Sequence, residues 1–210
     1  TFTIQPVEFW SLYMRVDLLC TALVLGGLVL GLKAIEQPRC IIPAAILFVL
    51  AVYTKQTAVA APASVFGTLL FVRPQTALAG IGTAVVLGLC IMAAMLLWTD
   101  GGFIRHILFY NINRVDLHGL LIIVANINDQ LALTACGLIG VIQQVKFARR
   151  TMVASGSGGL RGFVTVLRTD RGQARRVMVL AYLAICTLML GMIAKSGAAD
   201  NYLIEWNCLL

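Results

Sequence analysis

The sequence predicts an all-α protein, a polytopic transmembrane helical bundle of about six spans that include a short helical hairpin. Composition is the first indication, since 60% of the residues are hydrophobic and 12% are charged, whereas soluble domains are about half apolar and a quarter charged. The second is that apolar residues form continuous runs rather than the alternating pattern of a transmembrane β-barrel. With a mean hydropathy of +0.92, the chain is expected to lie in a bilayer.

The first predicted span covers residues 18–32, directly after Arg15 and Asp17. This apolar run is shorter than the roughly 20 residues that usually cross a membrane. We therefore expect the polar side chains that flank it to extend toward the headgroups.

A helical hairpin is predicted next. The run 41–72 would measure about 48 Å as one helix, which is too long for a hydrocarbon core of about 30 Å. Lys55 and Gln56 interrupt this run. We expect two short arms, 41–53 and 57–72, that meet at these two residues and are embedded among other helices.

Further elements are predicted in the second half of the chain. Residues 77–98 form the clearest span, and 99–118 form a polar segment with apolar side chains at helical spacing, as in a helix that lies in the membrane interface. Further spans are expected over 120–144 and 177–194. The segment between these two spans, 146–176, is expected to be a basic loop.

The two ends of the chain indicate a fragment. The sequence has no initiator Met, and its first residues lack the basic region of a signal peptide. Residues 203–210 resemble the start of another apolar helix. We therefore expect 1–210 to be a single transmembrane domain that belongs to a longer chain.

Positive charge is distributed unevenly between the two sides of the predicted spans. Residues 146–176 contain eight Lys or Arg and one acid, and the same side holds Lys33, Arg39 and Arg73. The other side holds Arg15, Lys55, Arg105, Arg114 and Lys195. The positive-inside rule then predicts that the basic loop faces the cytoplasm, where it would contact anionic lipid headgroups. A basic balance of this origin does not imply a nucleic-acid partner.

The polar residues on the opposite, extracytoplasmic side are candidates for a site. Lys55 requires an anionic partner if it is buried, and that partner could be a lipid phosphate; the alternative is an interfacial anchor. Arg15 could bind a phosphate bidentately, and Asp17 could orient a sugar hydroxyl or neutralise Lys55. The structural alternative for Arg15 and Asp17 is a helix cap with a flanking arginine.

A second polar cluster lies on the same side, between two apolar helices. Its members are Lys195, Asp200, Asn201 and Tyr202. Asn and Tyr side chains are suited to hydrogen-bonding sugars. The alternative is an ordinary loop in which Asp200 or Asn201 caps the final helix.

We expect no cofactor and no metal site at the histidines, and metal dependence stays open. His106 and His118 are about twelve residues apart in the sequence, whereas zinc-binding His pairs use much closer spacing. The six cysteines have no CxxC or CxxH spacing and lie in or beside apolar runs. They are expected to pack as small hydrophobic residues.

Several segments resemble the multi-spanning GT-C glycosyltransferases, specifically the bacterial relatives of aminoarabinose and protein-mannosyl transferases. The first two are MRVDLLCTALVLGGLVLGL and LAVYTKQTAVAAPAS, which match the family's R-x-D-L and T-K-G or T-K-Q motifs through Arg15, Asp17, Leu18, Thr54, Lys55 and Gln56. GGFIRHILFYNINRVDL resembles an extracytoplasmic loop of the family. KSGAADNYLIE resembles its G-x-x-x-NY-x-x-E loop, with matches at Gly197, Asn201, Tyr202 and Glu205.

The resemblance implies a protein of the bacterial inner membrane. It would transfer a sugar from a polyprenyl-phosphate carrier to a lipid or glycan acceptor at the extracytoplasmic face of the cell envelope. The residues expected to bind the carrier phosphate or sugar are Arg15, Asp17, Lys55, Gln56, Arg105, Lys195, Asn201 and Tyr202. Three of them, Lys55, Arg15 and Arg105, would neutralise the phosphate as it leaves. The family's catalytic acid lies upstream of the R-x-D segment, where this chain has only Glu8, so no catalytic residue is assigned.

Two other classes of protein are compatible with these features. A non-catalytic accessory or scaffold subunit would pack on partners in a larger membrane complex, and small residues such as Gly26, Gly27, Gly31 and Gly80 would allow close helix packing. A transporter would also use broken helices and charges near the midplane, but no internal repeat is visible.

Overall fold

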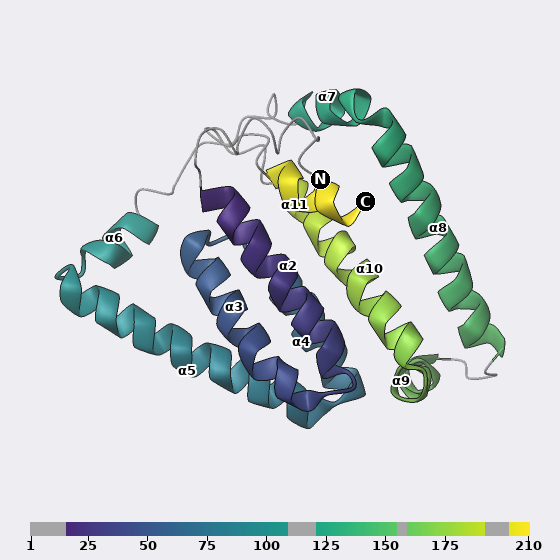
Figure 1. Ribbon diagram of the computed structural model, residues 1–210, viewed down its shortest axis with the longest axis horizontal. Coiled ribbons are helices and arrows are strands. Elements are labelled where there is room, and N and C mark those ends of the chain that lie inside the picture. Colours follow the sequence, from purple (N-terminus) through teal and green to yellow (C-terminus); the bar gives the residue numbers. More distant parts are fainter. Residues whose placement is uncertain (1–15, 109–120, 155–158, 192–201) are drawn as a thin grey trace.

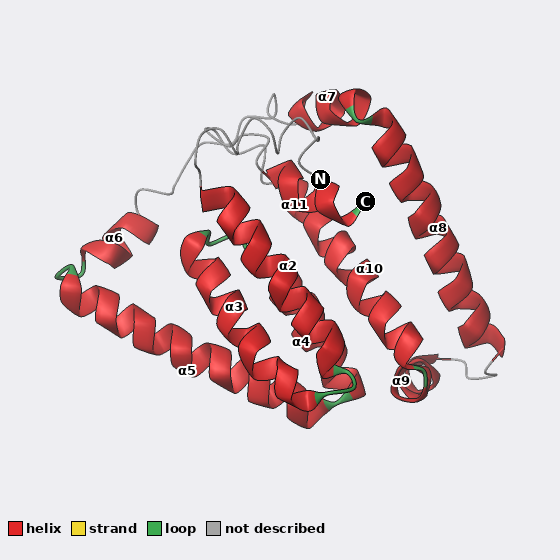
Figure 2. Cartoon of the chain, viewed as in Figure 1, coloured by secondary structure: helices red, strands yellow, loops and turns green. Residues whose placement is uncertain are grey.

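The computed structural model describes residues 16–108, 121–154, 159–191 and 202–210 (Figure 1). Every regular element in these ranges is a helix (Figure 2), which confirms the predicted all-α class. Three of the described helices are long and apolar enough to cross a membrane: α2 (Val16–Ala34), α5 (Pro74–Trp98) and α8 (Leu131–Ala154). The structure is therefore compatible with membrane insertion, although these three helices alone do not establish the predicted six spans.

The predicted hairpin is present. Its arms are α3 (Ile41–Thr54) and α4 (Ala60–Val72), and Lys55 begins the turn between them. A short 3-10 helix, η1 (Pro38–Cys40), leads into α3. With 14 residues, α3 is about 21 Å long at 1.5 Å per residue, which is shorter than a hydrocarbon core of about 30 Å. The tip of the hairpin lies beside the start of α2, where Lys55 contacts Asp17.

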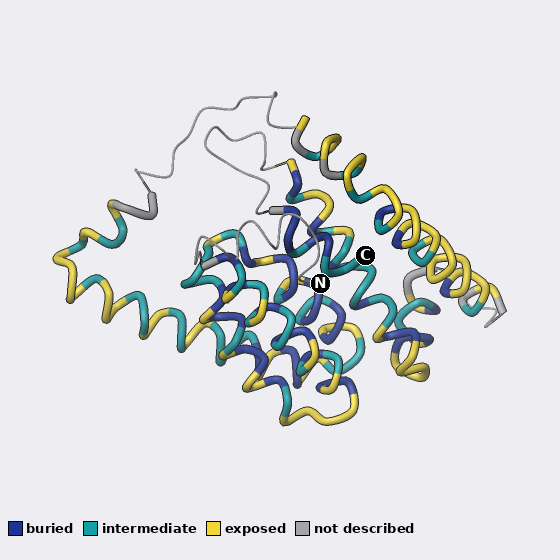
Figure 3. The backbone as a smooth tube through the Cα atoms, turned by 45° about the horizontal axis from the view of Figure 1, so that its top comes forward, coloured by how far each residue is buried: buried dark blue, intermediate teal, exposed yellow. Residues whose placement is uncertain are grey.

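Helices α2, α3, α4 and α10 (Arg171–Met189) form the centre of the bundle (Figure 3). Each contributes a fully buried side chain to one core: Val24, Phe48, Val65 and Tyr182. A Cβ atom at Gly27 would lie 2.4 Å from Cε1 of Phe48. The missing side chain therefore lets α2 approach α3 closely.

Helices α5 and α8 lie at the periphery and expose apolar side chains. In the most apolar stretch of α5, 6% of the helix is buried inside the protein, and in that of α8 17% is buried. The corresponding value for the central helix α2 is 39%. The exposed side chains include Val86, Leu89 and Leu97 on α5 and Leu131 and Ile139 on α8. Apolar surface of this extent is unusual in water and normal against lipid.

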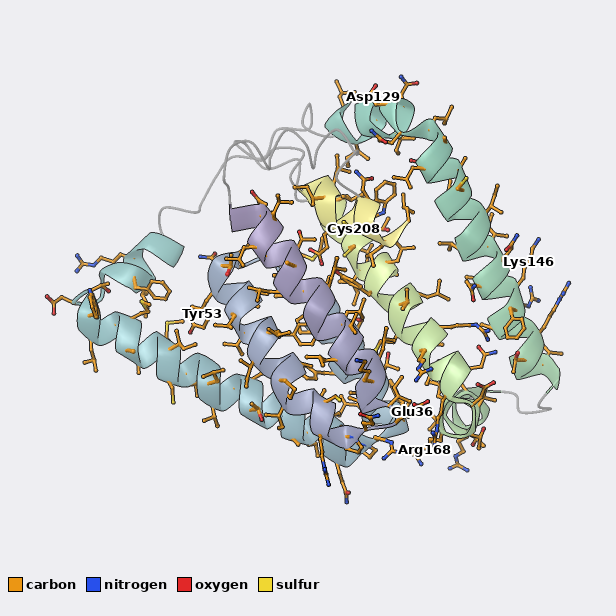
Figure 4. All side chains as sticks on the ribbon, viewed as in Figure 1. Glu36, Tyr53, Asp129, Lys146, Arg168 and Cys208 are labelled. Atoms are coloured by element: carbon orange, nitrogen blue, oxygen red, sulfur yellow. The ribbon has the colours of Figure 1, made fainter. Side chains whose placement is uncertain are left out.

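Helix α6 (Gly102–Leu108) is the described part of the predicted interfacial helix in 99–118. Its Phe103 ring stacks on Tyr53, with 6.2 Å between the ring centroids. Tyr53, labelled in Figure 4, also donates a hydrogen bond from Oη to the carbonyl of Gly88 at 2.6 Å. These two contacts attach α6 and the middle of α5 to the end of α3. Residues 109–120 lie outside the described ranges.

The predicted span over 120–144 is divided in the structure, so the prediction of one continuous helix is wrong. Helix α7 (Leu121–Asp129) ends before a turn at Gln130, and α8 begins at the next residue. Asn128 and Asp129 precede the turn. Asn and Asp are residue types that disfavour helix interiors, because their side chains can compete for backbone hydrogen bonds.

The last predicted span also differs at its boundaries. Helix α10 begins at Arg171, six residues before the predicted start at 177, because Asp170 caps it. Oδ1 of Asp170 accepts a hydrogen bond from the backbone N–H of Gln173 at 3.0 Å, as expected of an N-cap aspartate. The helix ends at Met189, and residues 192–194 of the predicted span lie outside the described ranges.

The described part of the basic segment 146–176 is mainly helical. It comprises the end of α8, the amphipathic α9 (Gly159–Thr169) and the first turns of α10. Figure 1 shows α9 nearly end-on beneath α10, so α9 crosses the end of the bundle rather than extending along it. Arg175 and Arg171 approach Oε1 of Glu36 at 2.9 and 3.8 Å, and these contacts hold α10 to the end of α2.

Figure 4 shows Glu36 and Arg168 together at this end of the molecule and Asp129 at the opposite end. Nε of Arg168 donates to the backbone carbonyl of Phe71 at 2.9 Å, which attaches α9 to α4. Helix α9 and the start of α10 in the basic segment therefore lie near the end of α2, whereas the contact between Asp17 and Lys55 lies at the start of α2.

Candidate functional site

An ion pair joins the start of α2 to the tip of the hairpin. Nζ of Lys55 donates to Oδ1 of Asp17 at 2.8 Å. The Asp17 side chain is 6% exposed and that of Lys55 is 21% exposed. Charges removed this far from water require partners. Neutralisation of Lys55, one of the two roles considered for Asp17, is therefore observed.

A second polar group forms between α10 and α11 (Tyr202–Leu209). The hydroxyl of Tyr182 donates a short hydrogen bond to Oε1 of Glu205, and Sγ of Cys186 donates to the same oxygen at 3.6 Å. Tyr182 and Cys186 lie four positions apart on α10, so both present their side chains to α11. Nε1 of Trp206 adds a hydrogen bond to Oγ1 of Thr187 at 3.2 Å. These contacts hold α11 against the second half of α10.

Both polar groups line one pocket. Its walls are formed by Asp17, Cys20, Thr21, Lys55, Thr57, Cys186, Met189 and Glu205. These residues come from α2, the turn of the hairpin, α10 and α11, which are distant in the sequence. The start of α2 and helix α11, which contribute to the pocket, lie at the end of the bundle that is remote from α9; Figure 1 shows the positions of these helices.

The local sequence explains how Asp17 and Lys55 reach the pocket. Asp17 lies in the first turn of α2, where the helix dipole favours a carboxylate. Thr21 donates a hydrogen bond to the backbone carbonyl of Asp17 at 2.9 Å. Lys55 has an extended backbone, with φ of −149° and ψ of 115°, and it ends α3 so that its side chain extends from the tip.

The structure brings two of the predicted site residues, Asp17 and Lys55, into contact. Gln56 is exposed beside Lys55, and Arg105 is exposed on α6; neither is among the described residues that line the pocket. Three predicted site residues lie outside the described ranges: Arg15, Lys195 and Asn201. The side chain of Tyr202 also lies outside the described part of the structure.

Sequence reasoning did not assign Glu205, Tyr182 or Cys186 to the site. Glu205 belongs to one of the motif matches, and it is the one acid in the mainly apolar terminal segment 203–210. Tyr182 and Cys186 share the i, i+4 spacing that places two side chains on the same face of a helix. An ionisable residue in an apolar segment is a candidate for function, and this signal indicates Glu205.

The pocket brings charged and polar side chains together within an apolar bundle. Asp17 and Glu205 provide carboxyl groups, Lys55 an ammonium, and Thr21 and Thr57 hydroxyls. Among the described residues, no three metal-ligating side chains come together. Comparison with known proteins finds no match to this chain among family models, curated proteins or solved structures.

Proposed function

We propose that this chain is the carrier-binding part of a membrane glycosyltransferase, which moves a sugar from a polyprenyl-phosphate carrier to an extracytoplasmic lipid or glycan acceptor. The observation that supports the proposal is the buried pair of Asp17 and Lys55 in a pocket that also contains Glu205. The motif residues Arg15, Asp17 and Lys55 supplied the resemblance, and two of them meet in this pocket.

The chemistry of the pocket suits a phosphate-linked sugar. An ammonium in a low-dielectric environment stabilises the negative charge that develops on a departing phosphate. Lys55 is the pocket residue that can supply this charge, and Asp17 compensates it in the structure. Carboxyl and hydroxyl groups on the other walls can hydrogen-bond sugar hydroxyls.

The proposed topology has six spans: α2, α3, α4, α5, α8 and α10. The short arms of the hairpin would be shielded from lipid by α2, α5 and α10. The end of the bundle with α9 would face the cytoplasm of a bacterial inner membrane, and the pocket would face the other side. Exposed basic residues on α8 and α9, among them Arg149, Arg150 and Arg161, would contact anionic lipid headgroups.

Binding of polyprenyl phosphate tests the proposal. The full-length protein would be reconstituted in lipid nanodiscs, and bound polyprenyl phosphate would be measured by native mass spectrometry. We expect the wild-type protein to bind it, and the double variant Asp17→Asn/Lys55→Gln to bind it roughly tenfold more weakly or worse, a loss of about 1.4 kcal/mol. Lys33→Gln is the matched control, because Lys33 is an exposed lysine at the opposite end of α2.

The second candidate is an accessory subunit without catalytic activity. The observation that favours it is the exposed apolar surface of α5. Only 6% of the most apolar stretch of this helix is buried. A partner protein could cover this surface. Wild-type protein that binds no polyprenyl phosphate but copurifies stoichiometrically with another membrane protein would support this candidate against the transferase.

A further inference from the structure

Glu205 occupies a defined position in the pocket. Two donors from α10, the Tyr182 hydroxyl and the Cys186 thiol, bond to its Oε1. No residue in the described ranges forms a hydrogen bond with Oε2. The first oxygen is therefore held in place by α10, and the carboxyl group that carries the second oxygen lines the pocket.

The two carboxyl groups of the pocket have different surroundings. Oδ1 of Asp17 accepts a hydrogen bond from Nζ of Lys55 at 2.8 Å. Glu205 is held by uncharged donors and carries the second oxygen described above. One carboxylate thus compensates a cation, and the other has the arrangement expected of a group that exchanges a proton with a ligand.

We propose that Glu205 is the catalytic base of the transfer, an inference that rests on the function proposed above. The hydroxyl oxygen of the acceptor forms a bond to the anomeric carbon of the carrier-linked sugar. The bond between that carbon and the phosphate oxygen breaks, and its electron pair remains on the departing polyprenyl phosphate. The acceptor's hydroxyl proton passes to Oε2 of Glu205 and is later released to water. Tyr182 and Cys186 position the carboxylate through Oε1.

Turnover and binding are measured together on the full-length protein in nanodiscs. The donors are polyprenyl-phosphate mannose and polyprenyl-phosphate aminoarabinose with labelled sugars, and the acceptors are total lipids of the host membrane. We expect Glu205→Gln to reduce turnover by roughly 10²–10⁴-fold, the usual contribution of a general base. Because the amide keeps the shape of the side chain and an acceptor oxygen for Tyr182, binding of polyprenyl phosphate should stay within about twofold of wild type.

Two further variants separate catalysis from folding. Glu205→Asp keeps the carboxylate and should retain more turnover than Glu205→Gln. Glu36→Gln removes an acid at the opposite end of the bundle and should leave turnover unchanged. If Glu205→Gln transfers sugar at the wild-type rate, or loses binding and thermal stability in proportion to turnover, Glu205 is not the base, and the transferase proposal stands. If the wild-type protein neither binds polyprenyl phosphate nor transfers either sugar, both proposals are overturned.

Discussion

Lys55 and Asp17 lie 38 positions apart in the chain, yet Nζ of Lys55 is 2.8 Å from Oδ1 of Asp17. This contact joins the hairpin tip to the first turn of α2 and places opposite charges in a pocket within an apolar bundle. Its role in folding can be measured separately from any role in chemistry.

A double-mutant cycle on this pair should reveal coupling. We expect Asp17→Asn and Lys55→Gln to destabilise the protein individually, because each leaves a charge without its main partner, and the double variant to recover part of the loss. The coupling free energy should be roughly 1–3 kcal/mol, below the value for a fully buried pair, since Lys55 is 21% exposed. Thermal unfolding in detergent measures it; additive effects of the two substitutions would contradict the account.

Because α2 packs closely against α3, adding a methyl group at Gly27 should destabilise the protein. In Gly27→Ala the new methyl group would lie 2.4 Å from the buried Phe48 ring, so we expect a loss of roughly 1–3 kcal/mol despite the better helix propensity of alanine. Gly82→Ala is the matched control, because nothing lies within 4 Å of its new Cβ atom. Equal thermal midpoints for the two variants would show that the predicted helix contact is absent.

Asn207 predicts a stabilising substitution. Its side chain is buried, at 2% exposed, and neither its Nδ2 nor its Oδ1 forms a hydrogen bond within the described part of the structure. An unsatisfied buried amide costs free energy that an apolar side chain of similar size does not. Asn207→Leu should therefore raise stability by about 1–2 kcal/mol, whereas Asn128→Leu at an exposed position should change it little. A loss of stability in Asn207→Leu would mean that the amide has a partner after all.

The hairpin, the first span and the segregation of charge could be predicted from the sequence, because each depends on a local property. An overlong apolar run interrupted by Lys55 and Gln56 has to turn there. The break between α7 and α8 at Gln130 was not predicted, because hydropathy does not measure how strongly Asn and Asp disfavour a helix interior. The inclusion of Glu205 in the pocket depends on the packing of α11 against α10, a tertiary contact that no local pattern specifies.

The proposed orientation predicts the accessibility of the two ends. In spheroplasts, a membrane-impermeant maleimide should label Gln56→Cys, which lies beside the pocket, without permeabilisation. Arg150→Cys, at the basic end of α8, should be labelled only after the membrane is opened. Both positions are exposed in the structure, and the unsubstituted protein gives the background from its native thiols. The reverse pattern of labelling would invert the topology.

The central claim is that Lys55 acts on a carrier phosphate, and sugar transfer by variants of the Asp17–Lys55 pair tests it most directly. Lys55→Ala should abolish transfer from polyprenyl-phosphate donors without preventing membrane insertion. Asp17→Asn/Lys55→Gln removes both charges, so no unpaired charge is buried, and it should fold and still be inactive. Transfer at the wild-type rate by this neutral pair would show that Lys55 and Asp17 only stabilise the fold, and it would contradict the proposed function of the site.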